Sequence, residues 1–189
     1  SAIDERILGK EHPDYATCLY NLGNLYLNKG NYDKAEPYYL EAKNLREKIT
    51  GKEHSFYAWS LHSLALLYWY KGRYDLAEPL LLEAQSIREK VLGKAHYDYS
   101  VGLDNLVKLY WSMGKNEAAV RYLLEADIAE KNLLVKGATH FSSHELAAYS
   151  HKFESSLSRD FSFALMHKGM AASCYDNILF YKGFLLNTA

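Results

Sequence analysis

The five residues LGKEH at positions 8–12 return as TGKEH at 50–54 and as LGKAH at 92–96. The spacing between successive copies is 42 residues. A fixed period of this length indicates a chain built from repeated supersecondary units that stack on one another. Between the markers, the same register returns a second pattern, which reads NLGNLY, SLALLY and NLVKLY in the three successive units.

Each unit contains two predicted helices separated by a glycine turn. The turn glycines are Gly30, Gly72 and Gly114. In the first unit, both helices carry a stripe of apolar and small residues at helical spacing: Leu19, Leu22, Gly23 and Tyr26 in the first helix, and Ala35, Tyr39 and Ala42 in the second. One helix pair cannot bury this stripe alone, so neighbouring pairs must stack. The sequence therefore predicts an all-α fold, a right-handed superhelical stack of antiparallel helix pairs.

Two prolines stand inside the second helices of this pattern. Pro37 and Pro79 lie about six residues into their helices, where a proline removes a hydrogen bond and kinks the chain. We therefore expect these helices to be bent or to begin late.

The spacing of leucine, glycine, tyrosine and alanine resembles the tetratricopeptide repeat, whose ordinary period is about 34 residues. The longer period, with LGKEHPDYA at 8–16 and KAEPYYLEA at 34–42, is similar to the kinesin-light-chain type of repeat. The resemblance covers residues 8 to about 134. It is weakest in the third unit, where Val107 replaces a small residue and Asn116 replaces a tyrosine.

The period predicts a division into five segments. These are the end of a truncated preceding repeat at 1–10, three repeats at 11–52, 53–94 and 95–136, and a divergent C-terminal helix pair at 137–189. The opening segment indicates a piece excised from a longer array.

The C-terminal segment contains two expected helices. A capping-box pattern, SSHE, begins the first of them at 142, and the second covers 170–186. The sequence of this segment, including ELAAY and YDNILFYKGFLLN, resembles the segment that links repeats to the caspase-like CHAT peptidase domain in bacterial proteins. The resemblance implies that any peptidase chemistry would follow residue 189.

Composition excludes several classes of partner. The formal net charge is −1, from 22 basic and 23 acidic residues, so no strong field attracts nucleic acid or an anionic membrane.

The sequence contains no signal peptide and no apolar run of membrane-spanning length. Cys18 and Cys174 form no metal-binding or disulfide pattern, which favours buried thiols in a reducing compartment. We expect a cytoplasmic protein.

No catalytic, cofactor or metal site is expected. His12, His54 and His96 recur in the connectors, but helices 8–10 Å apart do not bring such side chains to about 2 Å from a shared zinc, so connector packing is the favoured interpretation. The zincin pattern HExxH fails after His144, and no phosphate-binding glycine loop or nucleophile elbow occurs. The sequence predicts a non-enzyme.

The remaining candidate site is the concave face of the first helices. At about 100° per residue, one stripe of each first helix points away from the core. Its residues are Thr17, Tyr20, Asn24, Leu27 and Asn28, then Trp59, His62, Leu66, Trp69 and Tyr70, then Val101, Asp104, Lys108, Trp111 and Ser112. All three tryptophans of the chain fall here, and tryptophan and tyrosine anchor interfaces. The alternative is that the tryptophans fill space between successive first helices.

Three functions follow from this pattern. The first is a protein–protein interaction scaffold that binds a peptide or partner protein in this aromatic groove. There, Asn24, Asn28 and His62 would hold peptide backbone and Lys108 would meet an acidic residue. The second is a non-catalytic regulatory or substrate-positioning arm of a CHAT peptidase. The third is a self-association module, in which open array ends stack on a second copy.

Overall fold

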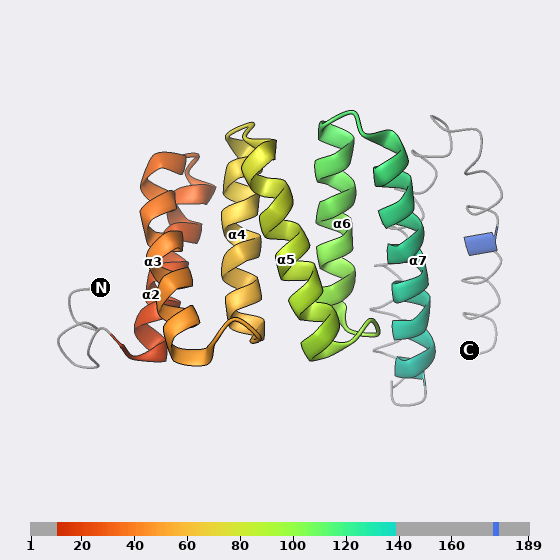
Figure 1. Ribbon diagram of the computed structural model, residues 1–189, viewed down its shortest axis with the longest axis horizontal. Helices are drawn as coiled ribbons and strands as arrows, with labels where there is room; N and C mark the ends of the chain where they lie inside the picture. The colour runs from red at the N-terminus through yellow and green to blue at the C-terminus, as the bar shows by residue number, and fades with distance from the viewer. Residues whose placement is uncertain (1–10, 139–175, 178–189) are drawn as a thin grey trace. The chain divides into compact units, whose positions relative to one another are not determined.

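The computed structural model describes residues 11–138 and 176–177. Residues 11–138 form six α-helices, drawn in chain order in Figure 1: α2 (Pro13–Asn28), α3 (Tyr32–Thr50), α4 (Ser55–Tyr70), α5 (Tyr74–Leu92), α6 (Tyr97–Ser112) and α7 (Asn116–Ala138). The described part of the chain contains no strand, and the predicted all-α helical repeat fold is confirmed. The chain divides into two compact units, 1–123 and 124–189, and each is described by itself.

The turns inside the helix pairs depend on glycine. Gly30, Gly72 and Gly114 have φ values of +69°, +71° and +70°, a region that side chains rarely adopt. After α2, the N–H of Gly30 donates to Leu27 O at 2.9 Å and the N–H of Asn31 donates to Tyr26 O at 2.9 Å. These two bonds form a Schellman motif, which ends α2 and turns the chain back along it as α3.

The connectors between pairs end in a histidine cap. The Nδ1 atoms of His12, His54 and His96 accept from the backbone N–H two residues later, at 3.2, 3.1 and 3.1 Å. Each histidine is the N-cap of the helix that follows, so it satisfies one of the helix's free amide groups. These residues have a structural role, as expected, but they act as caps rather than through packing alone.

The expected late start of the second helices is wrong. α3 begins at Tyr32 and α5 begins at Tyr74, and both continue past their prolines. Pro37 and Pro79 are each the sixth residue of the helix and are exposed. At that position a proline removes one hydrogen bond, to the carbonyl four residues earlier, while its ring lies on the solvent side.

The core of each pair brings small residues against large ones. Tyr39 of α3 is fully buried, and an ideal Cβ built on Gly23 of α2 would lie 2.6 Å from its ring. Glycine is therefore required where the ring crosses α2. Ala35 and Ala42, on the same stripe, are also fully buried. Leu19 is buried as predicted, whereas Leu22 and Tyr26 are half-buried.

Successive pairs stack through a core cluster and through a repeated polar clamp. Tyr39 of α3 packs with Leu64 and Leu67 of α4. Beside this contact, Glu36 accepts from the Tyr68 hydroxyl at 2.8 Å and pairs with Lys71 at 2.8 Å, which lowers the pKa of the carboxyl group.

The same clamp recurs 42 residues later. Glu78 accepts from the Tyr110 hydroxyl at 2.8 Å and pairs with Lys115 at 3.1 Å. The predicted stacking of helix pairs is therefore observed in residues 11–123.

The second unit is described only in α7 and at residues 176–177. There the buried Asn177 donates to the buried Asp127 at 2.8 Å. The expected capping box at 142, most of the expected helix at 170–186, Cys174 and residues 1–10 lie outside the described residues. Cys18 is half-buried rather than buried.

Candidate functional site: an aromatic and polar wall on the first helices

The fifteen predicted groove residues lie on α2, α4 and α6, which side-chain contacts join into one wall. Ser63 of α4 donates to the Tyr20 hydroxyl of α2 at 3.2 Å. From α4 to α6, the indole N–H of Trp69 donates to Ser112 Oγ at 3.0 Å. We call this surface the inner wall.

None of the fifteen residues is buried. The exposed ones are Thr17, Asn28, Trp59, Tyr70, Lys108 and Ser112. The half-buried ones are Tyr20, Asn24, Leu27, His62, Leu66, Trp69, Val101, Asp104 and Trp111. Tyr20 and Leu27 also pack against the core cluster around Tyr39, so they share their surface between core and wall. The wall is accessible to a ligand over most of its residues.

The tryptophans combine the two roles that the sequence left open. The Trp59 indole N–H donates to Asp98 Oδ2 at 3.1 Å, and Trp69 bonds Ser112, so both rings bridge α4 to α6. Trp59 nevertheless keeps 38% of its surface exposed. Its ring therefore covers the seam between two first helices and also presents an apolar face to solvent.

Aromatic rings gather at both ends of α4. At its start, Phe56 packs edge-on against Trp59, with ring centroids 6.0 Å apart. At its end, Tyr70 contacts Trp69 at 5.2 Å and stacks on Tyr32 of α3 at 5.8 Å. Phe56 and Tyr70 are 47% and 52% exposed. These rings are the apolar anchors that the wall offers.

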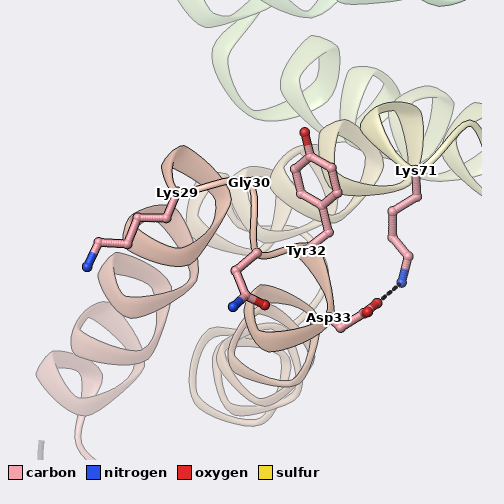
Figure 2. Close-up of a pocket in the computed structure, with 6 residues that line it drawn as sticks. Lys29, Gly30, Tyr32, Asp33 and Lys71 are labelled. Atoms are coloured by element: carbon pink, nitrogen blue, oxygen red, sulfur yellow. Dashed lines mark hydrogen bonds and ion pairs between the residues drawn. The ribbon is translucent and has the colours of Figure 1, made fainter.

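A hollow of about 490 Å³ lies beside the second aromatic group, at the turn between α2 and α3 (Figure 2). Its lining residues are Lys29, Gly30, Asn31, Tyr32, Asp33 and Lys71. In Figure 2, Lys71 reaches Asp33, at 3.0 Å, while Lys29 points away from that pair. Lys71 also pairs with Glu36, so its charge is already neutralised. The hollow therefore lies at a contact between two repeats, beside the inner wall.

A polar group behind the wall connects α2, α3 and α4. The buried guanidinium of Arg46 lies over the Tyr20 ring, 4.7 Å from its centroid. It donates to Ser60 Oγ at 2.9 Å and to the Phe56 carbonyl at 3.2 Å. Tyr20 is therefore supported from behind by a cation whose hydrogen bonds reach the next repeat.

The equivalent group in the next repeat has different chemistry. His62 replaces Tyr20, Arg88 replaces Arg46, and Asn105 replaces Ser63, each 42 residues later. Arg88 Nη1 lies 3.4 Å from His62 Nδ1, and Asn105 Nδ2 lies 3.4 Å from His62 Nε2. Burial, followed by the charges of Arg88 and Lys108, lowers the pKa of His62 to about 3. The ring is neutral at pH 7 and lies between Arg88 of α5 and Asn105 of α6.

Sequence reasoning missed the supporting residues of the wall. Arg46, Ser63, Arg88 and Asn105 were not among the predicted site residues, although their 42-residue spacing was available as a signal. Asn24, predicted to hold peptide backbone, accepts from the Tyr39 hydroxyl at 2.7 Å through its side-chain oxygen. Its amide nitrogen is the group that remains to face a ligand.

The described residues contain no group of three or more histidine, cysteine or acidic side chains placed to hold a metal ion. Every helix in those ranges is too short or too polar to serve as a membrane span. His12, His54 and His96 are occupied as helix caps.

Comparisons with solved structures place the fold among kinesin-light-chain-like repeat proteins. The crystal structure of BtubC (BKLC) from P. vanneervenii superimposes with a TM-score of 0.65 at 20% identity, over 93% of this chain and 65% of that one. This chain therefore spans less than two thirds of BtubC. A kinesin-light-chain-like protein of Podosopora anserina with nearly identical repeats matches with a TM-score of 0.58 at 18% identity, over 94% and 98% of the two chains.

Two sequence comparisons gave different results. A search of curated proteins finds no match. The family model described as tetratricopeptide repeat matches three overlapping segments, residues 1–48, 19–90 and 56–126. Repeats of this family generally mediate protein–protein interactions, and their fold is typically non-catalytic. The family model matches well over half of the chain, so the chain belongs to the tetratricopeptide repeat family.

Proposed function

We propose that this chain is a non-catalytic interaction scaffold of the cytoplasm that holds a peptide or partner protein against the inner wall. The observation that carries the proposal is the exposure of large rings on α4. Trp59 is 38% exposed and Tyr70 is 52% exposed, and both are held in place by neighbours. A rigid aromatic ring binds a partner with little loss of side-chain entropy, and such residues dominate interface energies.

The polar residues between the rings supply hydrogen bonds for a bound chain. The Asn24 amide nitrogen and the exposed Lys108 ammonium lie on α2 and α6 within the predicted stripe. An extended peptide carries carbonyl groups that such donors bind. We therefore expect aromatic anchoring to supply most of the affinity and these donors to fix the register of the guest.

The test is affinity capture from an extract of the source organism with quantitative mass spectrometry. We expect Trp59→Ala combined with Tyr70→Ala to reduce the captured partner at least about tenfold, because truncation of an interface anchor costs about 2 kcal/mol or more. The folded state must be checked by circular dichroism and thermal melting.

A matched control is available on the second helices. Leu40 of α3 and Leu82 of α5 are 39% and 37% exposed and lie outside the inner wall. Leu40→Ala with Leu82→Ala removes a similar number of exposed apolar side chains. If this control abolishes capture and the wall variant does not, the partner binds the second helices and the proposal is wrong.

We propose two alternative functions, each with its own test. A role as the arm of a CHAT peptidase rests on the resemblance of the segment after residue 137, and reading the gene past residue 189 for a caspase-like histidine and cysteine pair tests it. Self-association rests on the stacking surfaces of the repeats. Sedimentation at several concentrations of the full chain tests it, with a concentration-independent monomer as the contrary result.

A further inference from the structure

Residues at the junction between α5 and α6 leave polar atoms buried without partners. In the part of the chain that the structure describes, four buried side-chain atoms have no hydrogen-bond partner. Three of them are Gln85 Oε1, Arg88 Nε and Ser100 Oγ, and all three residues lie on α5 or α6. A buried polar atom without a partner loses its hydration and receives nothing in return. These atoms therefore contribute unfavourably to the closed junction, and access of water would remove that contribution.

The residue at 102 removes a further hydrogen bond from this junction. An ideal Cβ on Gly102 would lie 1.9 Å from Gln85 Oε1 and 2.8 Å from Arg88 Nη1. The two polar side chains of α5 thus occupy the space that a side chain on α6 would fill. At the preceding junction the same register holds Ser60, whose hydroxyl accepts from Arg46 at 2.9 Å. Replacing serine by glycine removes the acceptor and leaves the arginine without that bond.

His62 adds a second conflict at the same place. Arg88 Nη1 and Asn105 Nδ2 face the two ring nitrogens, each at 3.4 Å. The Asn105 nitrogen is fixed as the donor because it also donates to the Val101 carbonyl at 2.9 Å. A neutral imidazole has one acceptor nitrogen and one N–H, so it accepts from only one of the two donors. The other contact places two N–H groups against each other.

Side-chain hydrogen bonds also cross this junction. Gln85 Nε2 donates to the Tyr99 carbonyl at 3.1 Å, which crosses from α5 to α6. On the wall side, the Trp59 and Trp69 indoles bond Asp98 and Ser112 of α6 at 3.1 and 3.0 Å. These wall-side bonds are exposed to solvent, so water competes with them.

We propose that the junction between α5 and α6 is the flexible joint of the array, at which α6 moves against α5 while the junction between α3 and α4 stays closed. Opening hydrates Gln85, Arg88 and Ser100 and separates Asn105 from His62. Movement of α6 also carries Lys108 and Trp111, so it changes the width of the inner wall. The joint is a property of the free chain and does not depend on any partner.

The experiment is amide hydrogen exchange with mass spectrometry on the full chain at pH 7. We would compare the amide exchange rates of the two junctions. The α5–α6 junction is represented by residues 85–92 and 97–104, and the α3–α4 junction by residues 43–50 and 55–62, which occupy the same register one repeat earlier. We expect the first set to exchange at least about tenfold faster, since local opening of the less stable junction exposes its amides. Equal exchange rates at the two junctions would overturn the proposal.

A matched pair of variants separates the joint from ordinary fraying. Ser100 has Ala58 as its counterpart 42 residues earlier. Ser100→Ala therefore removes a hydroxyl from the α5–α6 junction, and Ala58→Ser adds one at the equivalent place in the α3–α4 junction. Ser100→Ala should slow exchange at 97–104 by roughly threefold or more, because an unpaired buried hydroxyl is removed. Ala58→Ser should accelerate exchange at 55–62. A folded Ser100→Ala variant with unchanged exchange contradicts the proposal.

A second variant rebuilds the closed junction. Gln85→Lys with Gly102→Ser gives α5 and α6 the residues found at 43 and 60. The new hydroxyl restores an acceptor for Arg88, and exchange at 85–92 should fall toward the rate at 43–50. If this variant folds and exchanges as fast as the unaltered chain, the glycine is not the cause of the opening and the proposal fails.

Discussion

The two junctions between helix pairs share a register and differ in how they treat a buried arginine. Arg46 lies between two aromatic rings and bonds a hydroxyl and a carbonyl of the next repeat. Arg88 is as deeply buried, yet its guanidinium contacts His62 of its own repeat and its Nε atom has no hydrogen-bond partner. The period preserves the backbone arrangement at both places, while the bonding across the junction changes.

This contrast separates the fold from its local stability. The glycine turns, histidine caps and alanine stripe recur in each pair, and they suffice to stack the helices. The polar residues behind the inner wall vary between repeats without loss of the stack. A repeat array can therefore place a stable region and a mobile one within the same regular scaffold, because each interface contributes its own free energy.

The largest expected difference concerns the two arginines. Arg46→Met should reduce the free energy of unfolding by about 2 kcal/mol, because it removes two hydrogen bonds from a charged donor and a cation–π contact. Arg88→Met should cost less than about 1 kcal/mol, since an apolar side chain of similar length replaces a poorly paired buried cation. Urea denaturation of both variants measures the difference. Equal losses would show that the junctions are energetically alike.

The second prediction uses the titration of His62, which has no counterpart at Tyr20. Burial holds the pKa of His62 at about 3, whereas the unfolded ring titrates near 6.5. Between these two values the unfolded state binds more protons, so stability falls as the pH is lowered from about 6.5 toward 3.

His62→Tyr should remove this slope, because it installs the residue of the preceding repeat. At pH 4 the unaltered chain should have lost about 1–2 kcal/mol more than the variant, a figure reduced for the partial exposure of the ring. Denaturation at pH 7 and pH 4 measures the loss. An NMR titration that shows His62 protonating near pH 6.5 in the folded chain contradicts the assignment.

A smaller effect is expected at Gly102. Gly102→Ala places a methyl group on Gln85 Oε1 and turns this side chain away from the Tyr99 carbonyl. The net cost should be about 1 kcal/mol, since the better helix propensity of alanine offsets part of the clash. Gln85→Ala in the same chain should restore most of the stability. Thermal melts of the single and double variants measure the rescue, and independent, additive losses would exclude this contact as the cause.

The smallest effect belongs to the ion pairs outside the junctions. Lys90 pairs with Glu53 at 3.3 Å, and Lys48 pairs with Glu11 in the repeat before. All four side chains are well exposed. Glu53→Gln should change stability by less than about 0.5 kcal/mol, and raised salt should erase the change. A larger loss would mean that the connectors contribute to the difference between the junctions.

Sequence reasoning predicted the parts of the fold that depend on backbone period. The glycines at 30, 72 and 114 marked the turns, and the stripe of Ala35, Tyr39 and Ala42 identified the core face. The residue types at these positions are dictated by φ or by the space available, so they can be read from one sequence. The inner wall was placed on the three first helices by the same argument, and its role as a binding site stays a prediction.

The parts that escaped prediction depend on side-chain partners. The connector histidines recur as clearly as the glycines, but their role as caps requires knowing that Nδ1 reaches the amide two residues later. Arg46 and Arg88 look alike in the sequence. Their difference arises from Ser60 against Gly102 and from Tyr20 against His62, residues that adjoin them only after the helices stack. The prediction that α3 begins late was wrong because the sequence alone does not show that Pro37 lies on the solvent side of the helix.

The placement of the indoles gives the protein a built-in optical probe. Every tryptophan of the chain lies on α4 or α6, so fluorescence excited selectively from indole originates from a single surface. Emission wavelength, quenching by iodide and anisotropy would each respond to a guest covering that surface or to a displacement of α6. Occupancy and motion can thus be followed in unlabelled material, with an excitation wavelength chosen so that the tyrosines of the second helices do not contribute.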